Sequence, residues 1–182
     1  RDQSRRLLPR ATVCRGADGA IEITLGSNAI FSANATLDAS QSTYALQLDA
    51  NQDSDDMYIV ATSVSGGDQV ILGSGADTLF AGAGNDTVDA SFGGNDSINL
   101  GLGNNRVDFD DSLTSGDVVN GTAGTDTLTY RDLGTATNEL NNVTGMELVS
   151  VVGADGAIEQ GLAHRDGVAR SEEHTSELQS HS

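Results

Sequence analysis

Aspartates that recur at a nearly constant interval are the residues of this chain best suited to do chemistry. They are Asp68, Asp77, Asp86 and Asp96, and Asn105 takes the next place, at intervals of nine, nine, ten and nine residues. A glycine stands two residues before each of them. An aliphatic residue stands two residues after each, and these are Val70, Leu79, Val88, Ile98 and Val107. A fixed repeat of this length predicts a solenoid.

The carboxylates of such a repeat predict a cation site. If one coil takes two nonapeptides, Asp68 lies near Asp86 on one edge and Asp77 lies near Asp96 on the opposite edge. Two bare carboxylates about 5 Å apart repel each other by roughly 1 kcal/mol in water, and by more at a lower dielectric constant. A column of them therefore requires a cation. Carboxylates and turn carbonyls are hard oxygen ligands, which favours calcium.

The residues between the aspartates indicate how the aspartates are positioned. Glycines two apart, such as Gly73 and Gly75, suit a tight turn that needs unusual dihedral angles. The triplet around each aliphatic residue predicts a very short strand with that residue turned inward. Successive strands then stack in parallel, about 4.8 Å apart. We expect an all-β fold, a parallel β-roll or β-solenoid with irregular flanking strands.

The loops GSGADTLF and GAGNDTVD resemble the G-G-x-G-x-D-x-U-x nonapeptides of RTX (haemolysin-type) calcium-binding proteins. The resemblance covers about a quarter of the chain. It implies a β-roll in which Ca2+ is held between neighbouring turns by aspartate carboxylates and loop carbonyls. Carried over by position, the metal ligands would be Asp68, Asp77, Asp86 and Asp96 with the carbonyls of Gly73, Gly75, Gly82, Gly84 and Gly94.

A second, degenerate pair of the same repeat follows at Asp117 and Asp126, nine residues apart. Val119 and Leu128 take its inward positions, and Asp126 with Gly124 forms one more predicted ligand set. Four positions depart from the repeat: Ser63, Val64 and Phe92 stand where glycines are expected, and Asn105 replaces aspartate. A metal-free solenoid, in which stacked asparagine and aspartate side chains cap the turns, is the alternative interpretation.

The charge of the chain agrees with a cation-dependent fold. Residues 16–160 contain 22 acidic residues and only two arginines, Arg106 and Arg131, so this segment carries a net charge of about -20. Without counter-ions such a chain should be expanded, and calcium binding would drive folding. The same charge argues against binding to nucleic acid or to an anionic membrane surface. No apolar run is long enough to span a membrane.

We find no catalytic motif in the sequence and predict that the chain is not an enzyme. The motifs G-x-S-x-G and H-E-x-x-H are absent, and the three histidines all follow residue 163. Lysine is absent, which excludes a P-loop and a lysine nucleophile. The single Cys14 excludes a disulfide framework within the chain and suits an extracellular protein stabilised by calcium.

Five regions are expected along the chain. Residues 1–15 hold five arginines and are interpreted as a non-native segment or a fragment edge, with a basic tail for acidic partners as the alternative. A β-rich flank at 16–62, the RTX-type roll at 63–109, and a degenerate repeat with strands at 110–160 follow. Residues 161–182 are interpreted as an artefactual tail, because RSEEHTSELQS matches the translation of a common sequencing adapter.

Two further signals are weaker. The heptapeptide GADGAIE occurs at 16–22 and again at 153–159, which indicates either a repeated module or two joined reads. Asp49, Asn51, Asp53 and Asp55 alternate as in an EF-hand loop, but Ser54 replaces the required glycine and Val60 replaces the bidentate glutamate. We interpret this stretch as an acidic turn, with an extra calcium site as the alternative.

Two functions follow from these features. The first is a calcium-dependent structural module of a secreted bacterial surface, S-layer or adhesin-like protein. Its partners would be calcium ions, other copies of itself or cell-surface glycans. The alternative is the calcium-binding segment of a secreted hydrolase, protease or epimerase whose catalytic domain lies elsewhere. Both place the chain outside the cell.

Overall fold

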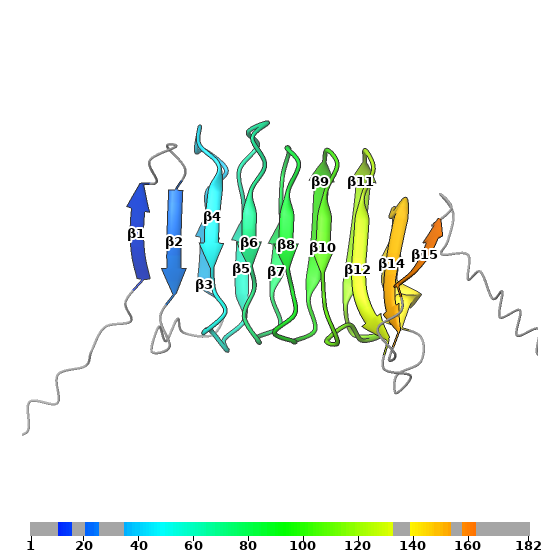
Figure 1. Ribbon diagram of the computed structural model, residues 1–182. Helices are drawn as coiled ribbons and strands as arrows, with labels where there is room; N and C mark the ends of the chain where they lie inside the picture. Colours follow the sequence, from blue (N-terminus) through cyan, green and yellow to red (C-terminus); the bar gives the residue numbers. More distant parts are fainter. Residues whose placement is uncertain (1–10, 16–20, 26–34, 133–138, 154–157, 163–182) are drawn as a thin grey trace, which may run out of the picture.

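Strands stacked side by side in two sheets make up the protein in the computed structural model (Figure 1). The structure describes residues 11–15, 21–25, 35–132, 139–153 and 158–162. The expectations for residues 1–10 and 163–182, and most of both GADGAIE copies, lie outside this part of the chain. The strands that the structure describes, together with one short 3-10 helix, confirm the expected all-β solenoid.

The first sheet has nine strands, in the order β1-β2-β4-β6-β8-β10-β12-β14-β15. Its strands are β1 (Ala11–Arg15), β2 (Ile21–Leu25), β4 (Leu46–Asp49), β6 (Gln69–Ile71), β8 (Thr87–Asp89), β10 (Arg106–Asp108), β12 (Thr127–Asp132), β14 (Leu148–Gly153) and β15 (Ile158–Leu162).

The second sheet has six strands, in the order β13-β11-β9-β7-β5-β3. Its strands are β3 (Ala35–Asp38), β5 (Met57–Val60), β7 (Thr78–Phe80), β9 (Ser97–Leu102), β11 (Val118–Ala123) and β13 (Val143–Thr144), the last preceded by the 3-10 helix η1 (Glu139–Asn142).

Successive strands of the chain alternate between the two sheets from β3 to β14, so each coil contributes one strand to each sheet. A nonapeptide is therefore half a coil, one turn followed by one strand. All pairings are parallel except β1 with β2 and β14 with β15, at the two ends of the nine-stranded sheet. The same two sheets continue on both sides of residues 63–109.

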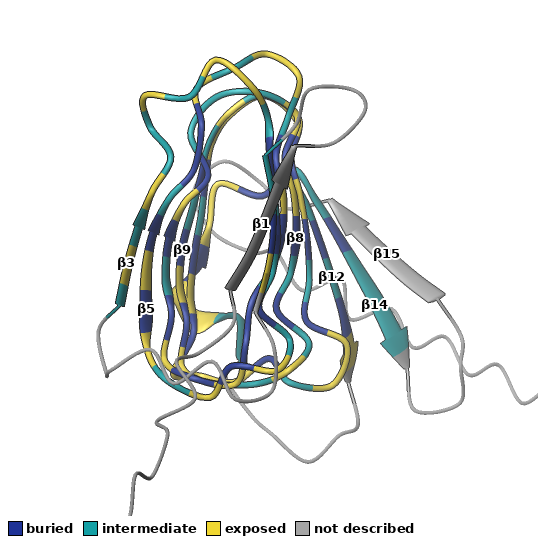
Figure 2. Cartoon of the chain, turned by 90° about the vertical axis from the view of Figure 1, so that its left-hand side faces the viewer, coloured by how far each residue is buried: buried dark blue, intermediate teal, exposed yellow. Residues whose placement is uncertain are grey.

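The core is a pair of aliphatic columns between the sheets, which Figure 2 shows as the buried inner faces. Every aliphatic residue predicted to turn inward is at most 2% exposed. In the nine-stranded sheet, strand register stacks Ile23, Leu48, Val70, Val88, Val107, Leu128 and Val149. In the six-stranded sheet it stacks Leu37, Ile59, Leu79, Ile98, Val119 and Val143. Each coil buries few side chains, so stability comes from contacts between neighbouring coils.

Candidate metal centre

The repeated aspartates form two rows, each at the turn that leads into the strands of one sheet. The first row, before the nine-stranded sheet, consists of Asp68, Asp86, Asn105 and Asp126. The second row, before the six-stranded sheet, consists of Asp77, Asp96 and Asp117. All seven side chains are buried, with at most 2% of the residue exposed. The structure thus brings Asp68 beside Asp86 and Asp77 beside Asp96, as expected for two nonapeptides per coil.

One side-chain oxygen of each row member bonds to the preceding coil. The backbone N–H of Asp68 donates to Oδ1 of Asp86 at 2.7 Å, and the N–H of Asp77 donates to Oδ1 of Asp96 at 2.9 Å. In the same way, the N–H of Asp96 donates to Asp117 at 2.7 Å. The rows therefore satisfy backbone donors that would otherwise be buried without partners.

The second oxygen separates the aspartates into two groups. Oδ2 of Asp86, Asp96 and Asp126 is buried and has no hydrogen-bond partner. Oδ2 of Asp68, in contrast, accepts from the backbone N–H of Thr62 at 2.7 Å and from its hydroxyl at 2.9 Å. A buried carboxylate oxygen without a partner is costly, and a cation would remove that cost.

A threonine completes Asp117 in the same way as Asp68. Oδ2 of Asp117 accepts from the backbone N–H of Thr114 at 2.8 Å and from the Thr114 hydroxyl at 3.0 Å. Oδ2 of Asp77 receives only the N–H of Gly73, at 3.3 Å. These two threonines were not among the site residues predicted from the sequence. The available signal was a threonine at a turn position shortly before the aspartate, where such side chains favour local hydrogen bonds.

Carbonyl oxygens lie close to the carboxylates in the turns. A Cβ atom on Gly94 would overlap the carbonyl oxygen of Gly75 and would lie 3.0 Å from Oδ1 of Asp96. A Cβ on Gly121 would overlap the carbonyl oxygen of Gly145 and would lie 2.6 Å from the unpartnered Oδ2 of Asp126. A carbonyl oxygen and a carboxylate oxygen therefore both lie close to Gly94, and another such pair lies close to Gly121. These are the hard oxygen donors that calcium prefers.

The remaining glycines that were predicted as ligands also lie in the turns before the row aspartates. Gly82, Gly84 and Gly124 adopt positive φ, and a Cβ on Gly73 or Gly75 would overlap the carbonyl oxygen of Asp53 or Asp55. In the described residues no three acidic, histidine or cysteine side chains come together as a metal cluster, so a bound ion would depend on main-chain carbonyls. The role of each predicted residue as a ligand stays a prediction.

Burial gives the row carboxyls unusual proton affinity. Desolvation raises the pKa of Asp96 to about 7, with a smaller contribution from the charges of Asp77 and Asp117. Desolvation likewise raises the pKa of Asp86 to about 6, with Asp68 and Asp126 adding to the increase. Both shifts reflect negative charge held in a poorly solvated place without a neutralising partner.

Arg106 and Arg131 pair with exposed aspartates outside the rows. Arg106 pairs with Asp108 at 2.7 Å and Arg131 pairs with Asp110 at 3.2 Å, and all four side chains are at least 36% exposed. Asn105 provides a neutral link instead. Its Oδ1 accepts from the N–H of Asp86 at 2.8 Å, and its Nδ2 donates to Oδ1 of Asp126 at 2.9 Å. This explains how the row continues through the missing aspartate.

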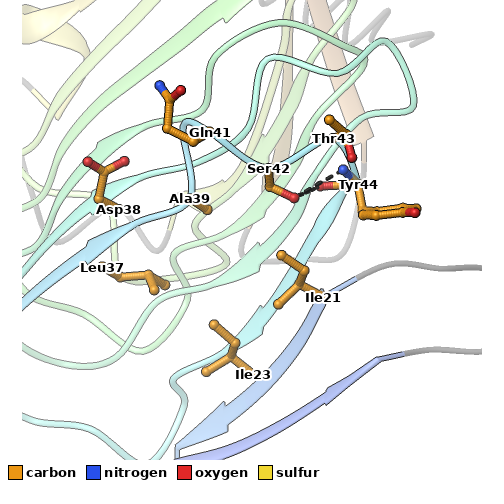
Figure 3. A pocket seen from close by; sticks show the side chains of 9 residues that line it. All are labelled: Ile21, Ile23, Leu37, Asp38, Ala39, Gln41, Ser42, Thr43 and Tyr44. Atoms are coloured by element: carbon orange, nitrogen blue, oxygen red, sulfur yellow. Dashed lines mark hydrogen bonds between the residues drawn. The ribbon is translucent and has the colours of Figure 1, made fainter.

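An open hollow of about 470 Å3 at the N-terminal end of the stack is a different kind of feature (Figure 3). Ile21 and Ile23 of β2 and Leu37 of β3 line its apolar side, and the turn from Asp38 to Tyr44 lines the other. Its lining contains a single carboxylate, Asp38. It is the open end of the core and resembles neither aspartate row.

Among the described residues no helix is long and apolar enough to cross a membrane. Comparison with curated proteins and with solved structures gave no match. The family model of the RTX calcium-binding nonapeptide repeat (4 copies) matches residues 62–93 and 91–107. These are the turns and strands that carry Asp68 to Asn105. Residues 62–107 are therefore RTX calcium-binding nonapeptide repeats, and Ca2+ is the ion that such repeats bind.

Proposed function

We propose that this chain is a calcium-dependent folding module of a secreted bacterial surface, S-layer or adhesin-like protein. The calcium-binding structural module itself follows from the RTX repeats. The observation that carries the folding role is the set of buried carboxylate oxygens without hydrogen-bond donors, on Asp86, Asp96 and Asp126. These oxygens are satisfied by no group of the described chain, and a cation would satisfy them.

Asp96 and Asp86 are the central ligands in this proposal. Oδ1 of Asp96 and the carbonyl oxygen of Gly75 both lie close to the Cβ position of Gly94. The unpartnered Oδ2 of Asp126 and the carbonyl oxygen of Gly145 both lie close to that of Gly121. The carbonyls of Gly73, Gly82, Gly84, Gly94 and Gly124 complete the proposed set. Asp68 ranks below the others as a ligand, because Thr62 already hydrogen-bonds its second oxygen.

Ion binding would be coupled to folding because the rows exist only in the coiled chain. In an unfolded chain the two row members Asp77 and Asp96 are separated by 18 intervening residues, and no ligand set is assembled. Calcium, when bound, supplies positive charge between coils that are each strongly acidic. The aspartates and turn carbonyls would hold the ion in place, while the aliphatic columns exclude water from the interior side.

The same coupling supports an extracellular location. Extracellular calcium modules bind with Kd values of about 10⁻⁴–10⁻³ M, so they are filled outside the cell and empty in the cytosol. A chain with a net charge of -18 would therefore stay expanded until it reaches calcium-rich surroundings. This supports a protein that is exported unfolded and becomes rigid at its destination.

The test is far-UV circular dichroism of the full chain during a calcium titration in chelator-treated buffer, with magnesium as the control ion. A cooperative coil-to-β transition with calcium alone is the expected result. Identical β spectra in chelator and in calcium would overturn the proposal, and the aspartates would then be turn caps of a metal-free solenoid.

A further inference from the structure

The turn between β4 and β5 contacts the next coil in the same way as the turns that precede the row aspartates, but it does so with different residues. The backbone N–H of Ser74 donates to the carbonyl of Asp53 at 2.9 Å, and the N–H of Met57 donates to Oδ1 of Asp77 at 2.9 Å. Asp53 thus lies against Gly73, and Met57 lies against Asp77. This turn has a carboxylate at the glycine position of the repeat and lacks one at the aspartate position.

Asp53 is a buried carboxylate with an unsatisfied oxygen. The residue is 3% exposed, although it lies in a turn. Its Oδ1 accepts from the N–H of Asp55 at 3.2 Å, and its Oδ2 is buried without a hydrogen-bond partner. An aspartate in a surface turn can usually point into water, so the burial of Asp53 requires an explanation.

Asp77 is the carboxylate that Asp53 meets across the two coils. The two residues meet at Gly73, because a Cβ on Gly73 would overlap the carbonyl oxygen of Asp53 and the N–H of Gly73 donates to Oδ2 of Asp77 at 3.3 Å. Desolvation raises the pKa of Asp77, and the charges of Asp53 and Asp56 contribute less. Asp77 is 1% exposed, and its Oδ2 has only the 3.3 Å contact from Gly73. Two buried carboxylates therefore lie at the same turn, and Oδ2 of Asp53 has no hydrogen-bond partner.

Carbonyl oxygens complete an oxygen-rich environment at this turn. A Cβ on Gly73 would overlap the carbonyl oxygen of Asp53, and a Cβ on Gly75 would overlap that of Asp55. Arg106 and Arg131 pair at other coils, with Asp108 and Asp110. Carboxylates and carbonyls without a protein cation form the donor set of a hard divalent ion.

We propose that Asp53 and Asp77 together bind a divalent cation, calcium by the nature of the donors, at the turn between β4 and β5. Asp53 lies outside the residues that the RTX family model matches, and it uses a different position of the repeat from the aspartates of the two rows. The choice of calcium rests on the proposed function. The Asp53 side of the site lies one half-coil toward the N-terminus from the residues that the family model matches. The nonapeptide repeat predicts no ligand there.

The experiment is calcium titration calorimetry of the full chain, comparing wild type, Asp53→Asn and the matched control Asp111→Asn, which makes the same charge change at an exposed residue. Asp53→Asn should bind one calcium ion fewer per chain, and Asp111→Asn should bind the wild-type number. Urea unfolding supplies a second measurement, in which the variant should be more stable than wild type while the site is empty. Because it removes a buried unpartnered charge, Asp53→Asn should unfold at higher urea than wild type at a calcium concentration that folds wild type but is too low to fill this site. It should also gain less from calcium.

The outcomes separate this inference from the proposed function. Wild type that binds no calcium would overturn both. Wild type that binds calcium, with an unchanged ion count in Asp53→Asn, would overturn this site alone. An Asp53→Asn protein that is less stable than wild type at that low calcium concentration, or does not fold there, would also overturn the site, since Asp53 would then be stabilising without an ion.

Discussion

At the scale of single residues, the buried aspartates divide their two oxygens between two tasks. Oδ1 of Asp86 and Asp96 accepts a backbone N–H of the preceding coil, and Oδ2 is left for a ligand from outside the described chain. Where a threonine provides both an N–H and a hydroxyl, as for Asp68, the second task is already complete. The type of the neighbouring turn residue therefore decides which aspartates need an ion.

Asp86→Asn tests this division of tasks. The amide oxygen can still accept the N–H of Asp68, but the charged ligand oxygen is lost. At a hundredfold excess of calcium over Kd, one site contributes about 2.7 kcal/mol, so the variant should lose about that much of the calcium-induced stabilisation. Urea unfolding at low and at saturating calcium measures this loss. Asp111→Asn is the control, and an equal loss in both variants would contradict the prediction.

Gly94→Ala tests the close approach of neighbouring turns. Gly94 has φ +120°, and an added Cβ would overlap the carbonyl oxygen of Gly75. The strained conformation alone costs about 1–3 kcal/mol, and the displaced carbonyl should also weaken calcium binding. Gly66→Ala is the matched control, because nothing lies within 4 Å of its Cβ position. Thermal unfolding in calcium should separate the two variants, and equal midpoints would show that the turn can relax.

At the scale of the elements, the nonapeptide made most of the fold predictable. Val70, Leu79 and Val88 are buried as expected, because a three-residue strand after a tight turn has only one inward position. The pairing of Asp68 with Asp86 followed from counting two nonapeptides to a coil. Local spacing was sufficient here because each coil contacts only its neighbours.

The elements that the repeat does not encode were less predictable. The sequence does not show that Thr62 caps Asp68, since that contact depends on how one irregular turn folds back. The buried Asp53 follows two extra residues, Asn51 and Gln52, which shift it to the glycine position of the next coil. The antiparallel strands β1 and β15 lie at sheet ends, where no repeat constrains the pairing. Each depends on contacts that spacing alone does not reveal.

Asn105→Asp tests the neutral link in the first row. The change removes the Nδ2 donor of Asp126 and places a third carboxylate between Asp86 and Asp126. At the lowest calcium concentration that folds wild type, the variant should be destabilised by about 1–3 kcal/mol, because an acceptor loses its partner and like charges approach. At saturating calcium the loss should be smaller. Equal destabilisation in both conditions, measured by urea unfolding, would mean that the new carboxylate gains no ion.

At the scale of the whole molecule, the buried acids make metal-free stability depend on pH. The folded-state pKa of Asp96 is about 7 and that of Asp86 about 6, above the ordinary value of 3.8. Between these values the folded protein binds protons that the unfolded chain has released. Stability therefore falls as pH rises from about 4 to about 7.

In chelator the chain should accordingly be more folded at pH 5 than at pH 8. Calcium affinity should change in the opposite direction, because protons compete for the same oxygens at low pH. Urea unfolding with circular dichroism at both pH values, in chelator and in calcium, measures both trends. Metal-free stability that rises with pH would contradict the raised pKa values. Asp96→Asn, which cannot titrate, should show a weaker pH dependence.

The direction of the inter-coil hydrogen bonds makes the two ends of the solenoid unequal when the chain is shortened. Each coil supplies acceptors to the coil before it, as Asp117 does for the N–H of Asp96. Removing coils from the C-terminal side leaves backbone donors that no cation can satisfy. Removing them from the N-terminal side leaves carboxylate oxygens that calcium or water can take up. Trimmed forms of equal length should therefore differ in how well calcium rescues them, and those shortened from the N-terminal side should be rescued better.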